Sequence, residues 1–490
     1  MRASGILMHI SSLPSPYGIG TMGAGAYRFA DFLHEAGQRY WQILPLGPTG
    51  LGDSPYQSCS THAGNPYFID PDLLVEDGLL LPQEAAEVAN AVRGERVDYG
   101  FQYMTRLDLL KKAFRRGRDR FAREIDDFRA AQPWVDDYAL FMAVKRSRDM
   151  ASWATWPEEI RLRKPGAVQT YATALADEIH FFRFVQFLFF RQWNALHEYC
   201  ASLGIEIIGD LPIYVPYDSC DVWTNPELFQ LDEEGRPTAV AGVPPDCFTE
   251  DGQLWGNPLY DWEKMRADGF RWWCDRVRSA AGLYDVIRID HFRGLESYWS
   301  VPYGDETARN GKWVKGPDKD FIRTLQREFP NLKLIAEDLG FLTPEVTELL
   351  ELSGYPGMKI LEFAFDPREP SDYLPHRYVR NCICYSGTHD NETLVKWFEG
   401  QGEDVLSYAC EYLGVTDRKE LIWAILRAGM ASIADTFIAQ LQDYLELGAE
   451  GRMNEPGTFG FPNWTWRVDE TALTPTLAKK IARLTKLYER

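Results

Sequence analysis

Short apolar runs rich in isoleucine and valine recur along the chain, and each ends in polar residues with glycine or proline. Runs of about four to six residues bounded in this way are typical of strands buried on both faces. Eight such runs can be recognised, the last less clearly than the others: 5–9, 40–44, 205–209, 284–289, 333–336, 358–361, 382–385 and 449–452.

Helical patterns lie between these runs. One set of apolar residues follows helical spacing and is closed by a glycine: Phe270, Trp273, Cys274, Val277 and Gly282. Thr343 followed by Pro344 is typical of a helix start, and Gly354 is typical of its end. The region 262–362 therefore alternates helix and strand, which indicates βαβ units.

Eight candidate strands in this alternation predict an α/β chain folded as a (β/α)₈ TIM barrel. A doubly wound open sheet fits the pattern nearly as well. We interpret residues 1–490 as one catalytic barrel with inserted, largely helical subdomains. The long helical stretch 75–175 is the first insertion. The second, 211–262, is rich in proline, glycine, aspartate and aromatic residues and follows a strand end.

Composition narrows the class of protein. Of 490 residues, 45% are hydrophobic and 25% charged, as in an ordinary globular chain. A net charge of −20 argues against a nucleic-acid partner, and no apolar stretch is long enough to predict a membrane span. The eight cysteines are scattered without C-x-x-C spacing, and the N-terminus lacks a signal-peptide pattern. We expect reduced thiols in a cytoplasmic protein.

Carboxylates follow several predicted strands. Asp210, Asp290 and Glu337 come directly after apolar runs, and Asp390 lies five residues beyond Tyr385. The carboxyl ends of parallel barrel strands open on one face, so these acids should converge there. Like charges gathered in one place are unfavourable, and such clusters are typical of active sites.

Two of these acids have environments suited to opposite protonation states. Arg288 and Asp290 project to the same side of their strand, so the guanidinium should keep Asp290 ionised, as a nucleophile requires. Glu337 follows a strongly apolar run, and partial burial there favours the neutral form of a general acid. This pairing suits glycosyl transfer.

No motif predicts a metal or an organic cofactor. His9, His62 and His291 lack the spacing of a metal-binding motif. The glycine-rich turn 46–53 lacks the G-K-[ST] ending of a phosphate-binding loop. We interpret this turn as substrate-facing, carrying Tyr56 toward the bound ligand.

Motifs across nearly the whole chain resemble the amylomaltases of the 4-α-glucanotransferase family, glycoside hydrolase family 77, related to the α-amylase superfamily. Four segments resemble the superfamily's signature regions: 209–213 (GDLPI), 288–294 (RIDHFRG), 336–340 (AEDLG) and 387–391 (GTHDN). Other matching segments are 10–20, 53–57, 64–67 and 452–458.

The resemblance implies roles for individual residues. Asp290 would be the nucleophile, Glu337 the acid/base and Asp390 the transition-state stabiliser. The remaining residues would bind or position substrate: Tyr56, Asp210, Phe248, Trp255, Arg288, His291, His389 and Asn454. The resemblance also implies an α-1,4-glucan donor, a glucose or maltooligosaccharide acceptor, retention of configuration and no cofactor.

The segment 242–260 resembles the family's mobile loop over the site. Its expected purpose is to keep water from a covalent glycosyl-enzyme that awaits a sugar hydroxyl. Phe248 and Trp255 are its candidate covering aromatics. Cys247 stands where the family pattern has an aromatic residue, so we expect one stacking surface to be absent.

The sequence thus predicts a retaining 4-α-glucanotransferase that moves glucan segments onto the 4-hydroxyl of an acceptor. Two alternatives stay open on the residues alone. The first is an α-glucan hydrolase that uses the same acids with water as acceptor. The second is a non-catalytic glucan-binding protein on the same fold.

Overall fold

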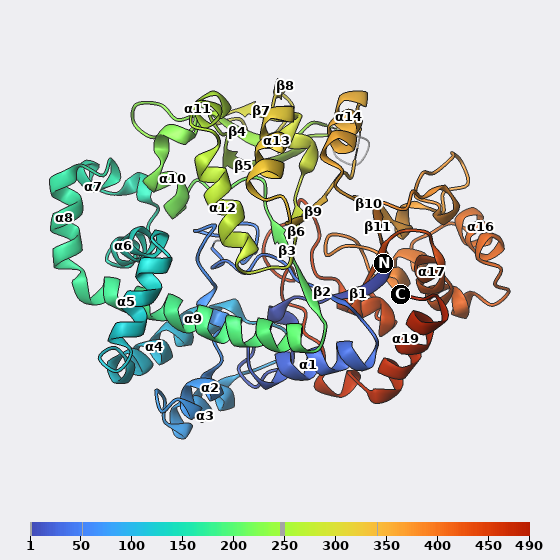
Figure 1. Ribbon diagram of the computed structural model, residues 1–490, viewed down its shortest axis with the longest axis horizontal. Coiled ribbons are helices and arrows are strands. Elements are labelled where there is room, and N and C mark those ends of the chain that lie inside the picture. Colours follow the sequence, from blue (N-terminus) through green and yellow to red (C-terminus); the bar gives the residue numbers. More distant parts are fainter. Residues whose placement is uncertain (1, 51, 246–249, 341) are drawn as a thin grey trace.

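The computed structural model describes residues 2–50, 52–245, 250–340 and 342–490. Within these ranges, parallel strands form a central sheet (Figure 1). In chain order they are β1 (Ala3–Leu7), β2 (Tyr40–Gln42), β3 (Glu206–Leu211), β6 (Val286–Ile289), β9 (Lys333–Ala336), β10 (Gly357–Ile360), β11 (Cys382–Tyr385) and β12 (Thr436–Gln440).

These eight strands form a nearly closed barrel. Apart from β9 and β10, neighbours in chain order pair in parallel, and β1 pairs with both β2 and β12. Between β9 and β10, the Ala336 N–H donates to the Pro356 carbonyl at 3.0 Å. The Met358 N–H donates to the Asp338 carboxylate there at 2.6 Å. The predicted (β/α)₈ class is confirmed, and the open sheet is excluded.

The prediction of the eighth strand was wrong. Ala449–Gly451 forms a short 3-10 helix, and the eighth strand is β12, Thr436–Gln440. The segment at 449 has no β-branched or aromatic residue, whereas β12 contains threonine, phenylalanine and isoleucine. β12 follows the apolar helix α17 (Leu421–Ala431) after only a short turn, so helix and strand read as one apolar stretch.

Helices alternate with the barrel strands. They are α1 (Ala24–Glu35), α9 (Ala176–Ser202), α10 (Cys220–Thr224), α11 (Trp262–Ala267), α12 (Arg271–Ala281), α13 (Asp318–Glu328), α14 (Pro344–Ser353), α15 (Leu394–Glu399), α16 (Glu403–Leu413), α17, α18 (Leu441–Tyr444) and α19 (Pro475–Leu487). The predicted caps of α14 are confirmed. The Thr343 side chain accepts from the Val346 N–H, and Gly354 adopts φ 67° after the helix.

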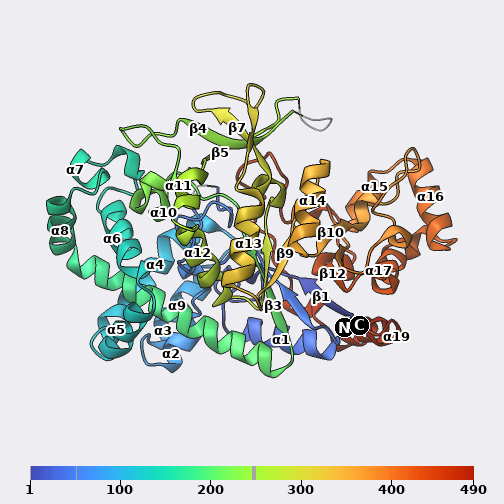
Figure 2. The same ribbon diagram turned by 45° about the horizontal axis from the view of Figure 1, so that its top comes forward.

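Between β2 and β3 the chain is largely helical. Before α9 come α2 (Pro71–Glu76), α3 (Pro82–Ala91), α4 (Tyr99–Gly117), α5 (Ala122–Ala131), α6 (Trp134–Arg146), α7 (Glu158–Arg161) and α8 (Pro165–Ala174). Figures 1 and 2 show α5 to α8 as a lobe at one side of the barrel. α9 contacts α6 in this lobe and also α1 and β3 in the barrel. We propose that 75–175 is a helical subdomain held to the barrel by α9.

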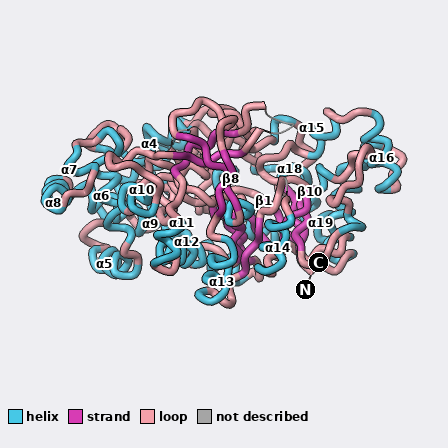
Figure 3. The backbone as a smooth tube through the Cα atoms, turned by 90° about the horizontal axis from the view of Figure 1, so that it is seen from above, coloured by secondary structure: helices cyan, strands magenta, loops and turns pink. Residues whose placement is uncertain are grey.

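A second, antiparallel sheet lies beyond the carboxyl ends of β3 and β6. Its strands are β4 (Ala239–Val243), β5 (Gln253–Pro258), β7 (Ser297–Pro302) and β8 (Lys312–Lys315), in the order β5-β4-β7-β8. Figures 2 and 3 show it over one end of the barrel. The segment 242–260 was expected as a loop, but it begins at the end of β4 and contains all of β5, and these two strands pair antiparallel. We propose that 211–262 is a separate insertion. No helix in the described ranges is long and apolar enough to span a membrane.

Gly209 on β3 allows the Tyr284 ring to pack inside the fold. A Cβ at this position would lie 2.1 Å from that ring, and Tyr284 is buried. We expect Gly209→Ala to destabilise the protein by about 1–3 kcal/mol, because overpacking a rigid core forces neighbours to shift. Thermal melting measures the effect. Gly166→Ala on α8 is the matched control, since its Cβ would meet no atom within 4 Å. Equal melting temperatures for both variants would contradict the packing argument.

Candidate active site

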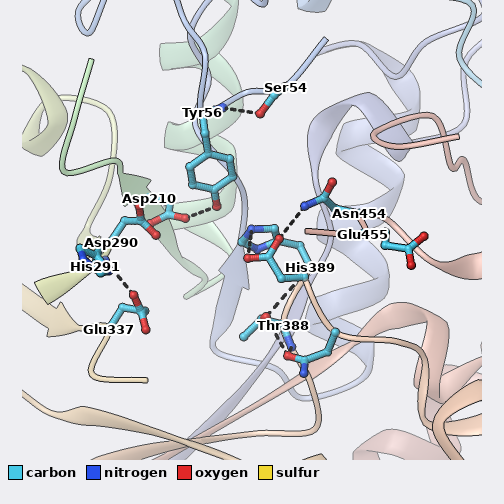
Figure 4. Close-up of polar contacts among 12 residues, drawn as sticks. Ser54, Tyr56, Asp210, Asp290, His291, Glu337, Thr388, His389, Asn454 and Glu455 are labelled. Carbon is cyan, nitrogen blue, oxygen red and sulfur yellow. Dashed lines mark hydrogen bonds and ion pairs between the residues drawn. The ribbon is translucent and has the colours of Figure 1, made fainter. Parts of the chain in front are cut away.

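The predicted acids converge at the carboxyl ends of the barrel strands, as Figure 4 shows for Asp210, Asp290, Glu337 and the neighbourhood of His389. Asp210 lies within β3, and Asp290 and Glu337 directly follow β6 and β9. The N–H of Asp290 donates to the Leu211 carbonyl at 3.1 Å, and that of Glu337 to the Ile289 carbonyl at 3.0 Å. The backbone hydrogen bonds between the barrel strands thus extend to Asp290 and Glu337 and hold their backbones in place.

Arg288 joins two of these acids. Its guanidinium donates to Asp210 at 2.7 Å and to Asp290 at 3.3 Å, as the alternation of the strand predicted. The side chains of Asp210 and Arg288 are only 1% and 4% exposed, so they have almost no surface for a substrate. The Asp210–Arg288 pair therefore lies under the site, and the half-buried carboxylate of Asp290 lies above it.

The protonation of Asp290 differs from the expectation. Burial raises the pKa of the Asp290 carboxyl well above its ordinary value; Arg288 opposes this, and the nearby carboxylates add to it. One guanidinium shared with Asp210 does not offset burial beside three other acids. Burial also raises the pKa of Glu337, as predicted, against the opposing effect of Arg288. The Asp290–Glu337 pair therefore holds a proton more tightly than two isolated carboxyls would.

Backbone N–H groups fix Glu337. The carboxylate accepts from the His291 N–H at 2.8 Å and from the Leu339 N–H at 2.9 Å. His291 can present its N–H in this direction because it adopts a left-handed conformation with φ 48°. A non-glycine residue in that region is strained, and such strain is typical of functional sites. Burial lowers the pKa of the His291 ring to about 4, which leaves it neutral.

Asp390 has different surroundings. Its carboxylate accepts from the Asn454 amide at 2.7 Å and lies 3.3 Å from His389 Nε2. Burial acts to raise the pKa of Asp390, but the interactions with His389 and Asn454 outweigh it and lower the pKa to about 2. Asp390 is therefore ionised at any physiological pH.

Aromatic rings connect the two sides of the site. The Tyr56 hydroxyl donates to Asp210, and its ring stacks on His389 with centroids 5.1 Å apart and an interplanar angle of 17°. Trp464 contacts both rings, at 5.9 Å from Tyr56 and 5.8 Å from His389. Trp464 was not predicted, because nothing in the local sequence separates it from the chain's other tryptophans.

The β4–β5 hairpin brings Trp255 to the site. Its ring meets the His291 ring edge to face, with centroids 4.9 Å apart, and its indole N–H donates to Gln253 at 3.1 Å. Trp255 keeps part of its surface exposed. Phe248, the other predicted covering aromatic, and Cys247 lie outside the described residues.

Ten of the eleven predicted site residues lie in the described ranges, and their contacts form two groups. Seven residues are joined from Asp290 to Asn454, and Glu337, His291 and Trp255 form the second group, which adjoins Asp290 along the chain. Tyr56 links Asp210 to His389, and Arg288 links Asp210 to Asp290. Glu337 accepts a hydrogen bond from the His291 N–H, and Asp390 accepts one from the Asn454 amide. Among the described residues, no group of three or more His, Cys, Asp or Glu side chains is placed to hold a metal ion.

Two buried acids beneath the Asp390 segment were not predicted. Asp443 accepts from the Ser386 hydroxyl at 2.6 Å and from the Leu394 N–H at 2.8 Å. Glu362 lies beside Gly387, where an added Cβ would be 2.6 Å from Glu362 Oε1. Burial raises the pKa of Asp443 to about 6, and burial together with the Asp443 charge raises that of Glu362 well above its usual range. These residues support the turn that carries His389 and Asp390.

The chain is similar to known proteins over nearly its whole length. A family model described as 4-alpha-glucanotransferase, glycoside hydrolase family 77, matches residues 8–473. A 4-alpha-glucanotransferase of Clostridium butyricum is 47% identical over 99% of this chain and 100% of its own length. One of Thermus thermophilus is 45% identical over 100% of this chain and 99% of its own. The solved structure of an amylomaltase from Streptococcus agalactiae, in complex with acarbose, is 41% identical, with a TM-score of 0.98 and full coverage of both chains.

The buried acid Glu362 makes stability depend on pH in a predictable direction. A carboxyl whose folded pKa is raised costs stability as pH rises above its ordinary value of 4.5. Glu362→Gln cannot ionise and removes this loss. We expect the variant to melt near the wild-type temperature at pH 4 and above it at pH 7, with the difference widening between them. Glu351→Gln, on the exposed side of α14, is the control. A difference that stays constant or narrows with pH would refute the assignment.

Proposed function

The chain belongs to the 4-alpha-glucanotransferase family, glycoside hydrolase family 77, and we propose that Asp290, Glu337 and Asp390 carry out its glycosyl transfer. It is an enzyme of the transferase class, on a barrel like that of the amylomaltase structure. The observation that supports the catalytic assignment most directly is that Asp290 and Glu337 follow adjacent barrel strands and lie close together (Figure 4). Asp290 also contacts the buried guanidinium of Arg288, and Asp390 contacts Asn454 on the other side of the site.

The first step uses Asp290 and Glu337 as a pair. Both pKa values are raised, so the two carboxyls together retain a proton that two isolated acids would lose. Arg288 lowers the pKa of both acids, but of the two it is Asp290 that contacts the guanidinium, at 3.3 Å. We propose that the proton shared by the pair therefore lies on Glu337 during the attack. Asp290 then attacks the anomeric carbon of the donor while Glu337 protonates the departing glycosidic oxygen. The product is a covalent glycosyl-enzyme on Asp290.

The second step reverses these roles. Glu337, now ionised, removes the proton from the 4-hydroxyl of an acceptor glucose or maltooligosaccharide. That oxygen attacks the anomeric carbon and displaces Asp290, so the configuration is retained. The lowered pKa of Asp390 keeps it negative throughout, beside His389 and Asn454. Its charge stabilises the positive character that develops on the sugar ring in both transition states.

Transfer requires that a sugar hydroxyl, and not water, completes the second step. The β4–β5 hairpin brings Trp255 against His291, beside the residues that hold Glu337. We propose that the hairpin covers the donor sugar, excludes water and shapes the acceptor site. The similarity to proteins named 4-alpha-glucanotransferases favours transfer over both the hydrolase and the non-catalytic alternatives.

The cellular location is a further part of the proposal. All seven cysteines in the described ranges are free: Cys59, Cys200, Cys220, Cys274, Cys382, Cys384 and Cys410. Free thiols suit a reducing compartment. We propose that the enzyme works in the cytoplasm on α-1,4-glucan donors with glucose or maltooligosaccharide acceptors, without a metal or organic cofactor.

Each proposed catalytic acid can be tested separately. We expect Asp290→Asn, Glu337→Gln and Asp390→Asn to keep the wild-type melting temperature within a few degrees. Each should lower kcat on maltotriose by on the order of 10³-fold or more, because each acid acts in the transition state. Chromatography of the oligosaccharide ladder measures the rate. The exposed Glu369→Gln is the control. Near wild-type turnover in any of the three would remove that acid from the mechanism.

The covering role of Trp255 predicts a change in product partition. Trp255→Ala should admit water and weaken acceptor positioning, at about 1–3 kcal/mol for a lost aromatic contact, and so raise the ratio of hydrolysis to transfer. New reducing ends measured against transfer products give this ratio. Leu254 is the neighbouring residue on β5 and projects to the opposite face, so Leu254→Ala is the control. A Trp255 variant with reduced stability but an unchanged ratio would show that the ring only packs.

A further inference from the structure

An exposed tryptophan lies on the edge strand of the antiparallel sheet. Trp313 on β8 is 43% exposed, although tryptophan is usually well covered. β8 is also the outer strand of the order β5-β4-β7-β8. Exposed aromatics on a sheet edge favour aggregation and are normally avoided unless they have a use. Lys312 and Lys315 are the first and last residues of β8. Their charges discourage the pairing of this edge strand with another chain, while the Trp313 ring stays exposed.

The Trp313 ring packs against Trp299 on the neighbouring strand β7. Trp299 is its direct cross-strand partner on β7, and the rings meet edge to face with centroids 5.2 Å apart. The Trp299 indole N–H donates to the Ala308 carbonyl at 2.9 Å, which fixes that ring in turn. A Cβ at Gly311 would lie 2.2 Å from Trp299, so only glycine leaves it room.

Arg293 covers one face of Trp313. Its guanidinium carbon lies 4.0 Å from the ring centroid, and Arg293 is itself buried. Although Arg293 stacks on one face and Trp299 contacts the ring, Trp313 remains 43% exposed, so part of the ring stays open to solvent. The result is a flat apolar surface fixed in one orientation, which binds without the entropy cost of ordering a flexible side chain.

This surface is connected to the catalytic segment. Arg293 belongs to the short 3-10 helix Phe292–Leu295, which directly follows Asp290 and His291. Three residues of chain span at most about 11 Å, so the backbone beneath Trp313 is anchored near the nucleophile. The same antiparallel sheet contains β5, which carries Trp255 to His291. Figures 1 and 2 show β4 and β7 of this sheet side by side.

We propose that Trp313, backed by Arg293 and Trp299, is an outer subsite that stacks a sugar of the glucan chain beyond the units next to the bond being transferred. The inference rests on the proposed function, since a glucan chain is the ligand that extends from this site. A pyranose ring has a flat apolar face that matches an indole ring, and no charge is needed for its recognition. Long donors or acceptors reach Trp313, whereas the shortest substrates do not fill it.

The test compares chain lengths within each variant. Trp313→Ala should lower the ratio of kcat/KM for maltoheptaose to that for maltotriose by about 3- to 10-fold, mainly through KM, as expected for one lost stacking contact. Trp313→Tyr keeps an aromatic ring and should lower this ratio of kcat/KM values only slightly. Tyr303→Ala, an exposed aromatic just beyond β7, should leave it at the wild-type value. Melting temperatures are recorded for all variants.

Binding without turnover separates this inference from the proposed function. In the Asp290→Asn background, calorimetric titration with maltoheptaose should show a 3- to 10-fold weaker affinity when Trp313→Ala is added. The outer subsite is refuted if Trp313→Ala lowers kcat/KM equally for maltoheptaose and maltotriose. It is also refuted if the variant changes neither the ratio of these two values nor the affinity for maltoheptaose. In both cases Asp290 keeps its role. An Asp290→Asn enzyme that still turns over maltotriose refutes the catalytic assignment. The effect of Trp313→Ala on the ratio of kcat/KM for maltoheptaose to that for maltotriose is then an independent result.

Discussion

The buried guanidinium of Arg288 is the interaction on which the rest of the site depends. It lies between Asp210 at 2.7 Å and Asp290 at 3.3 Å, with almost no access to water. A charge in such a position is tolerated only when it is paired, and removal of one partner from a buried pair typically costs about 3–5 kcal/mol. Asp210 also accepts from Tyr56, so one carboxylate fixes both the barrel strand and the loop that faces it. We therefore propose that Asp210 and Arg288 position the acids rather than contact substrate.

Around this pair the site separates two kinds of carboxyl. Asp290 and Glu337 lie where burial dominates, and their pKa values rise. Asp390 lies beside His389 and Asn454, and its pKa falls to about 2. One side of the site can therefore hold and release a proton, while the other remains negative throughout. Tyr56 spans the two sides, because its hydroxyl contacts Asp210 and its ring stacks on His389.

The sequence predicted what depends on strand ends and on short motifs. The acids after β3, β6 and β9 were recognisable because an apolar run stops at a carboxylate. The raised pKa of Asp290 could not be predicted, since it depends on how deeply four acids are buried together. Glu362, Asp443 and Trp464 were missed because their partners lie far away in the sequence. β12 was missed because an apolar helix runs directly into it.

The parallel pairing of β1 with β12 has a consequence for how the protein is made. Ala3 pairs with Thr436, so the first strand receives its second neighbour only after most of the chain exists. At a synthesis rate of about 5–20 residues per second, that delay is roughly 20 to 90 seconds. During this time one edge of β1 has unpaired N–H and carbonyl groups, and the apolar interior of the barrel is open. The nascent chain therefore keeps an unpaired strand edge for much longer than a protein built from local hairpins.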